Sequence, residues 1–238
     1  MKASGRTLWL VALSLTAFSQ PLWPQCKGYV QRQEQYGERK RIFHLFPSFP
    51  IVAEGVPFQP LSSGDKFCLA VDHTFDRITP VKAAFAAAFS QAINQPTGYE
   101  QGWDAYGKRF GAATGTITFN ELFSTYLFPS LLHQDPRYFR SGTGTTKQRI
   151  KYAITRIFVT RTDSGGDAFN WSYLLGTSFA AGMQNAYFPD RNRTFGDTFA
   201  SAGSTFGLGA GVNVLQEFLP ELERKFLKHQ SNSGPNRN

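Results

Sequence analysis

Residues with the chemistry of a site gather in the polar segments that lie between apolar stretches. The first segment holds His133 and Asp135, which could bind a metal or act as a base with its orienting carboxylate. Arg137 and Arg140 follow at once and could grip an anion. The alternative, which we favour, is a turn set by Asp135 and Pro136, with the arginines paired to acids on neighbouring helices.

Two later segments offer similar chemistry. Arg161, Asp163 and Ser164 stand beside two glycines and could form a small anion nest. Arg191 and Arg193 come just before a predicted helix start, where free backbone N–H groups favour anions. In both segments the alternative is an ordinary one, a helix cap with salt bridges, and we favour it.

The order of the helices predicts which segments meet. Two predicted helices, 147–161 and 169–188, separate the first segment from the third. In an up-and-down bundle this places loops 133–146 and 189–194 at one end and the middle segment at the other. If the protein binds a small ligand, we expect an anion between these two loops, with the histidine–aspartate pair as acid and base and the four arginines as the clamp.

Other kinds of site are poorly represented. His73 and Asp76 are three apart and could share a helical face, but one such pair does not make a metal site. We therefore expect no metal and no cofactor. The net charge is +8, yet the basic residues are scattered and no nucleic-acid motif is present. A basic exported protein is expected to meet anionic envelope or membrane surfaces rather than nucleic acid.

The N-terminus has the pattern of an export signal, residues 1–19. Lys2 and Arg6 give the positive start, residues 8–18 give a short apolar stretch, and cleavage is expected after Ser19. The alternative is an uncleaved N-terminal anchor. The signal predicts a location in the periplasm or cell envelope.

Two cysteines, Cys26 and Cys68, are the only ones in the chain. In an oxidising compartment an even count favours a disulfide between them. The alternative is a pair of free thiols, one near the mature N-terminus and one buried on a helix. We favour the disulfide.

The rest of the chain is predicted to be an all-α helical bundle. Residues 20–61 form a polar segment followed by a proline-rich strap, residues 62–230 form the helical domain of about five to seven helices, and residues 231–238 form a tail that is disordered by composition. No convincing strand alternation is present. The clearest helix starts are two capping boxes and one threonine–proline pair: Ser62 with Asp65, Thr194 with Asp197, and Thr79 with Pro80.

Small residues recur every four positions in three segments. Residues at this spacing lie on one face of a helix, so such a ladder predicts close helix–helix contact. Glycine inside a helix costs about 0.5–1 kcal/mol relative to alanine, and close packing would offset that cost. The three ladders are Gly107, Gly111 and Gly115; Gly203, Gly207 and Gly211; and Ala84, Ala88 and Ala92.

The longest uncharged stretches are Ala168–Pro189 and Thr198–Gln216. Both reach the length of a bilayer span, but both also carry side-chain amides. A bundle that is soluble or attached to a surface is the favoured interpretation. Helices inserted in a membrane, as an oligomer, are the alternative.

Three strings from the polar segments carry a resemblance: P-S-L-L-H-Q-D-P-R-Y-F-R, R-I-F-V-T-R-T-D-S-G and N-A-Y-F-P-D-R-N-R-T. With them the chain resembles, from about Lys66 to Phe226, a family of uncharacterised exported helical proteins of Acidobacteria and related bacteria. The resemblance implies export and a helical fold. It implies no activity, substrate or ligand.

Three functions follow as hypotheses. The first is a structural or interaction protein of the envelope, with self-association as one of its contacts. The second is an enzyme or binder for an anionic ligand that uses His133, Asp135 and the loop arginines. The third is a membrane-inserted helical oligomer.

Overall fold

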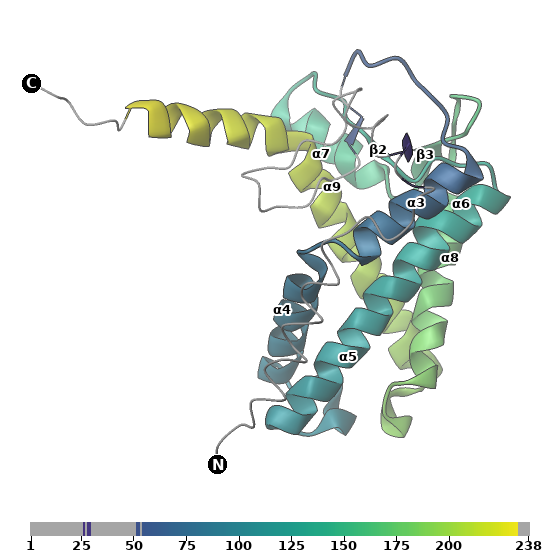
Figure 1. Ribbon diagram of the computed structural model, residues 1–238, viewed down its shortest axis with the longest axis vertical. Coiled ribbons are helices and arrows are strands. Elements are labelled where there is room, and N and C mark those ends of the chain that lie inside the picture. Colours follow the sequence, from purple (N-terminus) through teal and green to yellow (C-terminus); the bar gives the residue numbers. More distant parts are fainter. Residues whose placement is uncertain (1–25, 27, 30–50, 53, 233–238) are drawn as a thin grey trace, which may run out of the picture.

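The computed structural model describes residues 26, 28–29, 51–52 and 54–232. Within them the protein is an all-α bundle, as the sequence predicts (Figure 1). The predicted export signal, most of the segment 20–53 and residues 233–238 lie outside the described residues.

Three helices, α3, α4 and α9, begin where the sequence marks a helix start. Ser62 and Asp65 form a capping box at the start of α3, Pro80 lies in the first turn of α4, and the backbone N–H of Asp197 donates to Thr194 Oγ1 at 3.1 Å at the start of α9. The α-helices are α3 Ser63–Thr74, α4 Thr79–Ala92, α5 Trp103–Asn120, α6 Phe128–Leu131, α7 Thr146–Thr155, α8 Trp171–Met183 and α9 Phe195–Asn232.

One continuous rod forms the axis of the bundle. Helix α5 passes through a π-helical segment, η4 Glu121–Leu127, directly into α6. In Figure 1 this rod runs from the lower end to the upper end, while α8 begins at the upper end and finishes at the lower end. Short 3₁₀ turns complete the lower end: η3 Thr97–Tyr99, η5 Gln184–Ala186 and η6 Asp190–Asn192.

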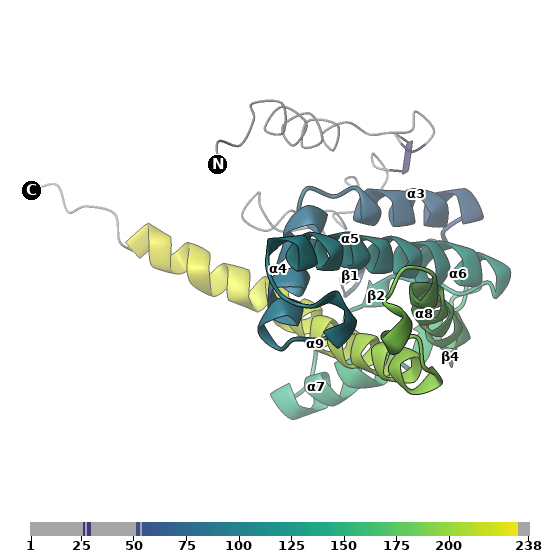
Figure 2. The ribbon, with the colours of Figure 1, turned by 90° about the horizontal axis from the view of Figure 1, so that it is seen from below.

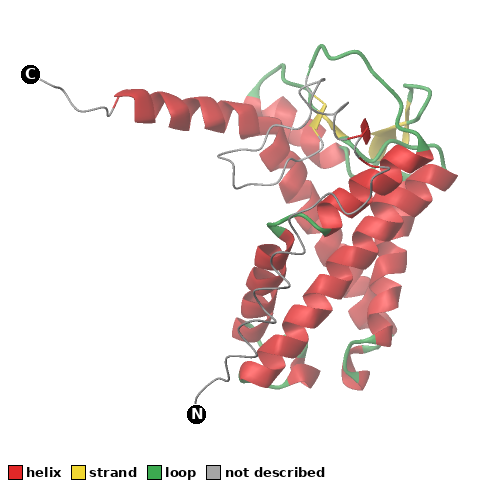
Figure 3. Ribbon diagram, in the orientation of Figure 1, coloured by secondary structure: helices red, strands yellow, loops and turns green. Residues whose placement is uncertain are grey.

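Two short strand pairs lie at the upper end, which we call the polar end (Figure 3). Strand β1 Ile51–Val52 pairs in parallel with β2 Tyr138–Phe139, and β3 Val159–Arg161 pairs in antiparallel with β4 Asp167–Phe169. The predicted helix 147–161 is therefore too long. It ends at Thr155, because the chain turns there and the β-branched residues that follow pair with β4.

The predicted ladders are not the contact surfaces of the helices. Helix α4 meets α5 through Ala83 and Ala87, one position away from the predicted alanines, and α5 buries Ala105 and Ala112. At 100° per residue, Gly107 lies on roughly the opposite face of α5 from Ala105. A Cβ atom added to five of the six ladder glycines would meet no described atom within 4 Å: Gly107, Gly111, Gly203, Gly207 and Gly211.

Glycines outside the ladders make the close approaches instead. A Cβ at Gly176 of α8 would lie 2.6 Å from the Cα of Ser124 in η4, so the two backbones touch only because the side chain is absent. On α9, a Cβ at Gly209 would overlap the hydroxyl of Tyr173. Small residues therefore do allow close helix contacts in this bundle. The glycines that allow them are Gly176 and Gly209, which do not belong to the predicted ladders.

Helix α9 does not stop near residue 219, where the sequence pattern ends. It continues through Pro220 to Asn232. Seen from below, α7 and α9 lie on one side of α5 and α3 lies on the other (Figure 2). The first part of α9 contacts α8 and α7.

A disulfide joins Cys26 to Cys68 in α3. Both cysteines belong to a small buried cluster with Tyr29, Leu61 and Leu69. The bond therefore attaches the segment that precedes the strap to the first helix of the bundle.

Candidate functional site

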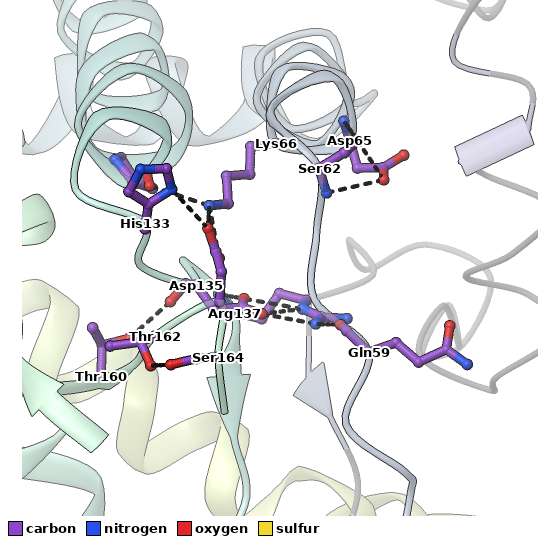
Figure 4. A network of polar contacts seen from close by, with 12 residues as sticks. Gln59, Ser62, Asp65, Lys66, His133, Asp135, Arg137, Thr160, Thr162 and Ser164 are labelled. Atoms are coloured by element: carbon purple, nitrogen blue, oxygen red, sulfur yellow. Dashed lines mark hydrogen bonds and ion pairs between the residues drawn. The ribbon is translucent and has the colours of Figure 1, made fainter. Parts of the chain in front are cut away.

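Asp135 and Arg137 form a buried ion pair at the polar end. The Asp135 side chain is fully buried, and Arg137 donates to it from Nε at 3.0 Å and from Nη2 at 2.8 Å. The same Nη2 also donates to the Gln59 carbonyl at 2.6 Å. Paired guanidinium and carboxylate charges of this kind hold each other in place when buried (Figure 4).

His133 is not a partner of Asp135. Its side chain is 84% exposed, and its Nδ1 lies 3.8 Å from the carboxylate of Asp163. Asp163 is held by Lys66, whose Nζ donates to both carboxylate oxygens at 2.8 and 2.7 Å and also to the Pro129 carbonyl at 3.1 Å. The expected acid–base pair of His133 and Asp135 is therefore not assembled; the histidine stands beside a lysine–aspartate pair (Figure 4).

The first and the middle polar segments meet, contrary to the predicted arrangement. The backbone N–H of Asp135 donates to the Arg161 carbonyl at 2.8 Å, and that of Asp163 donates to the His133 carbonyl at 2.9 Å. The prediction counted residues 147–161 as a helix that crosses the bundle. Helix α7 is short, and the β3–β4 hairpin that follows it stays at the same end, so the chain crosses the bundle only with α8.

The third segment lies at the opposite, lower end. The Asn192 side chain accepts a hydrogen bond at 3.1 Å from the backbone N–H of Gly98, next to the start of α5. Arg193 is paired with Asp190 at 2.8 Å and donates to the Phe188 carbonyl at 2.7 Å, while Arg191 is exposed. Arg191 and Arg193 therefore cannot form one anion clamp with Arg137 and Arg140.

Arg140 belongs to a second buried network, centred on Glu217 of α9. It donates to the Glu217 carbonyl at 2.8 Å and to the Glu221 carboxylate at 3.0 Å. The fully buried Glu217 carboxylate accepts from Arg149 at 2.9 Å, from the Tyr138 hydroxyl at 2.8 Å and from the backbone N–H of Gly142 at 2.9 Å. Glu217 thereby ties α7 and β2 to α9.

At the Glu217 carboxyl, burial and hydrogen bonding shift the pKa in opposite directions. Burial alone raises the pKa of the carboxyl, but hydrogen bonds from Arg149, the Gly142 backbone and Tyr138 outweigh burial and lower it. The pKa of Tyr138 is raised by burial and by its bond to Glu217. The network therefore holds Glu217 ionised and Tyr138 protonated.

His73, which could share a helical face with Asp76, is paired with a carboxylate of another element. Its Nδ1 lies 3.1 Å from Glu121 in the π-helical segment, whereas Asp76 accepts from the backbone N–H of Ile78. Thr125 donates to the same Glu121 carboxylate at 2.7 Å. Burial lowers the pKa of His73, but attraction to Glu121 outweighs burial and raises it; the pKa of Glu121 is lowered in return, against burial.

Three buried charged side chains were not predicted from the sequence: Lys66, Arg109 and Glu217. Lys66 is a charged residue on the face of α3 that also carries the buried Leu69 and Ala70, and that position was the available signal. Arg109 is buried at the lower end, where it donates to Gln91 and to the Glu100 carbonyl, both at 2.8 Å. No comparable signal marked Glu217.

Charged candidates of the first segment thus form ion pairs and hydrogen bonds within the protein. Arg137 and Arg140 are held by carboxylates and carbonyls, and Asp135 is closed to solvent. Among the described residues, no three histidine, cysteine, aspartate or glutamate side chains gather where they could hold a metal ion. Among the candidates of the first segment, His133 is open to solvent, next to Asp163.

Within the described part of the chain, none of the helices combines the length and the apolar character that crossing a membrane requires. Comparisons of the chain with protein-family models, with curated proteins and with solved structures found no match.

Proposed function

We propose that this chain is an exported, non-catalytic protein of the bacterial envelope that acts through contacts of its helical flanks, with self-association as the first of those contacts. The observation that carries the proposal is the flank of α9, defined as the outward-facing side chains of residues 198–216. Phe199, Leu208, Val212 and Leu215 are exposed there. Leu208, Val212 and Leu215 follow the spacing of one helical face, and exposed apolar groups on one face mark interaction surfaces.

The flank of α9 has the composition of a contact surface. Residues 198–216 include no charged side chain. Several hydroxyl groups on α9 turn back to their own helix: Thr198 donates to the Thr194 carbonyl at 3.1 Å and Thr205 to the Ser201 carbonyl at 3.0 Å. The exposed stripe of Gly203, Gly207 and Gly211 would let another helix approach closely, which gives the ladder a role between molecules.

The competing proposal, an enzyme or binder for an anionic ligand, has less support. Such a site needs free positive groups beside His133, and the nearby Arg137 and Arg140 already donate to carboxylates and carbonyls. The proposal of a membrane-inserted oligomer stays a prediction. The resemblance to exported proteins of Acidobacteria favours the envelope location, which is likewise a proposal.

The experiment is a measurement of molecular mass by light scattering on the mature chain, residues 20–238, recovered from the periplasm. We expect an oligomer for the unaltered protein and a monomer for Leu208→Glu combined with Leu215→Glu, because both side chains face outward. Gln148→Glu, an exposed position on α7, is the control for added charge. Self-association through this flank would be overturned if the unaltered protein is a monomer at every concentration. It would also be overturned if the double variant on α9 has the same oligomeric mass as the unaltered protein.

A further inference from the structure

The two faces of α7 differ in what they contact. The inner face carries Arg149 and Ala153, both buried: Arg149 binds Glu217, and the Ala153 carbonyl accepts a hydrogen bond at 3.2 Å from the Asn213 side chain. α9 therefore covers this face of α7. The opposite face is open.

Apolar and basic side chains share the open face. Ile150 and Ile154 are exposed, one helical turn apart, and Phe158, in the turn that follows the helix, is 50% exposed. Lys147 and Lys151 lie on the same face and are exposed as well. We call these five residues the α7 face.

The charge of the α7 face has one sign. Helix α7, residues 146–155, contains no acidic residue. Two acidic groups that bind arginines of α7 or of the turn after it are thereby engaged: Glu221 accepts from Arg149 at 2.6 Å, and the exposed Asp167 pairs with Arg156 at 3.2 Å. The two lysines are thus the positive groups that a partner of α7 would meet first.

An aromatic pair extends the α7 face. The backbone N–H of Asn170 donates to the Phe158 carbonyl at 2.8 Å, which places β4 and the start of α8 beside the end of the stripe. Phe169 and Trp171 flank Asn170, their ring centroids are 4.8 Å apart, and Trp171 is 54% exposed. Tryptophan beside an apolar stripe is typical of groups that lie at the level of lipid headgroups.

We propose that the α7 face binds the surface of an anionic phospholipid bilayer. The isoleucines and Phe158 enter the boundary between headgroups and acyl chains, and the lysines reach the phosphates over their apolar stems. Trp171 lies at the rim of the contact. This proposal goes beyond self-association, because it uses α7 and not the flank of α9.

A second protein is the weaker candidate for this face. Lysine is depleted in the centre of protein–protein interfaces, whereas here two lysines are interleaved with the isoleucines of one stripe. Helices that lie in a membrane interface carry lysine next to apolar groups in this way. Charge complementarity therefore favours an anionic lipid surface.

The test is sedimentation of the mature chain with phosphatidylcholine vesicles, with and without phosphatidylglycerol. We expect tighter binding to the anionic vesicles. Lys147→Gln combined with Lys151→Gln should weaken that binding about 25-fold, at about a factor of five for each lysine, and Lys→Arg at both positions should restore it. The matched control is Lys82→Gln with Lys108→Gln, which removes the same charge from exposed positions outside α7 and should change nothing.

The apolar part of the contact has its own readout. In a Trp23→Phe background, which leaves Trp103 and Trp171 in the mature chain, binding to anionic vesicles should shift the tryptophan emission to shorter wavelength. The shift should disappear when Trp171→Phe is added and persist when Trp103→Phe is added, since Trp103 lies at the lower end. Circular dichroism checks that each variant folds. The proposal is overturned by absent binding, by equal binding to neutral vesicles, by equal losses in the two double variants, or by α7 variants that change the molecular mass but not vesicle binding.

Discussion

At the polar end, the carboxylates of Asp135 and Glu217 are buried and arginines hold both of them; along the flank of α9, phenylalanine and leucine side chains face outward without a described partner helix over them. The Glu217 pair joins segments 68 residues apart, whereas Asp135 and Arg137 are two residues apart in one segment. Apolar surface on the flank is left unused by the fold. At the polar end, arginines and carboxylates that could do chemistry are bound to one another, whereas on the flank of α9 apolar side chains stay exposed.

The largest expected effect is at the polar end. Glu217→Ala removes the carboxylate that accepts from Arg149, Tyr138 and Gly142 and leaves Arg149 buried. We expect the free energy of unfolding in urea to fall by about 3–5 kcal/mol, the usual cost of removing one partner of a buried ion pair. Glu221→Ala, at a half-buried position, should cost less; equal costs would mean that the network is not centred on Glu217.

Substitutions of two glycines compare a buried helix contact with the exposed flank of α9. Gly176→Ala places a Cβ against the Ser124 backbone and should destabilise the protein by about 1–3 kcal/mol. Gly207→Ala, on the exposed flank, should stabilise it by about 0.5–1 kcal/mol, because alanine is the better helix former and nothing described lies within 4 Å. Thermal unfolding of the two variants should therefore shift in opposite directions; a loss at Gly207 as large as that at Gly176 would restore the ladder as an internal contact.

The smallest effect concerns pH and the pair of His73 and Glu121. The pKa of His73 is raised in the folded state, so its contribution to stability is fully present below the unfolded pKa and is lost as pH rises through the folded pKa. The pKa of Glu121 is lowered, so its contribution is present above the unfolded pKa and is lost as pH falls through the folded pKa. Stability from the pair is thus greatest between the two unfolded values.

Urea unfolding across that range measures this contribution. We expect the free energy of unfolding to decline above the unfolded pKa of His73 in the unaltered protein, and Glu121→Gln to reduce the decline because the amide carries no charge to hold the protonated imidazole. A decline of the same steepness in Glu121→Gln would assign it to other groups.

Local features of the fold were predictable from local sequence. The capping box of Ser62 and Asp65 and the proline at position 80 marked helix starts correctly, because a cap depends on residues three or four apart. The β3–β4 hairpin was missed, although Val159 and Thr160 before the Thr162–Gly166 turn were a usable signal. Missing the hairpin also placed the third polar segment at the wrong end.

The candidate site was less predictable, because its partners are distant. Lys66 and Asp163 are 97 residues apart, and Tyr138 and Glu217 are 79 apart. Neither spacing carries a periodic signal in one sequence. The length of α7 and the turn after it decide which arginine meets which carboxylate. If α7 is predicted too long, the loops are placed at the wrong ends of the bundle and the predicted ion pairs change with them.

These distances also set an order for folding. The helix pairs α4–α5 and the β3–β4 hairpin join neighbours in the chain and can form early, because closing a short loop costs little conformational entropy. The polar end cannot close until α9 has been made, since Glu217 comes only after the groups that it binds. A chain still emerging from the ribosome therefore holds Tyr138 and Arg149 without their acceptor, and the last helix completes a structure that the earlier ones cannot close by themselves.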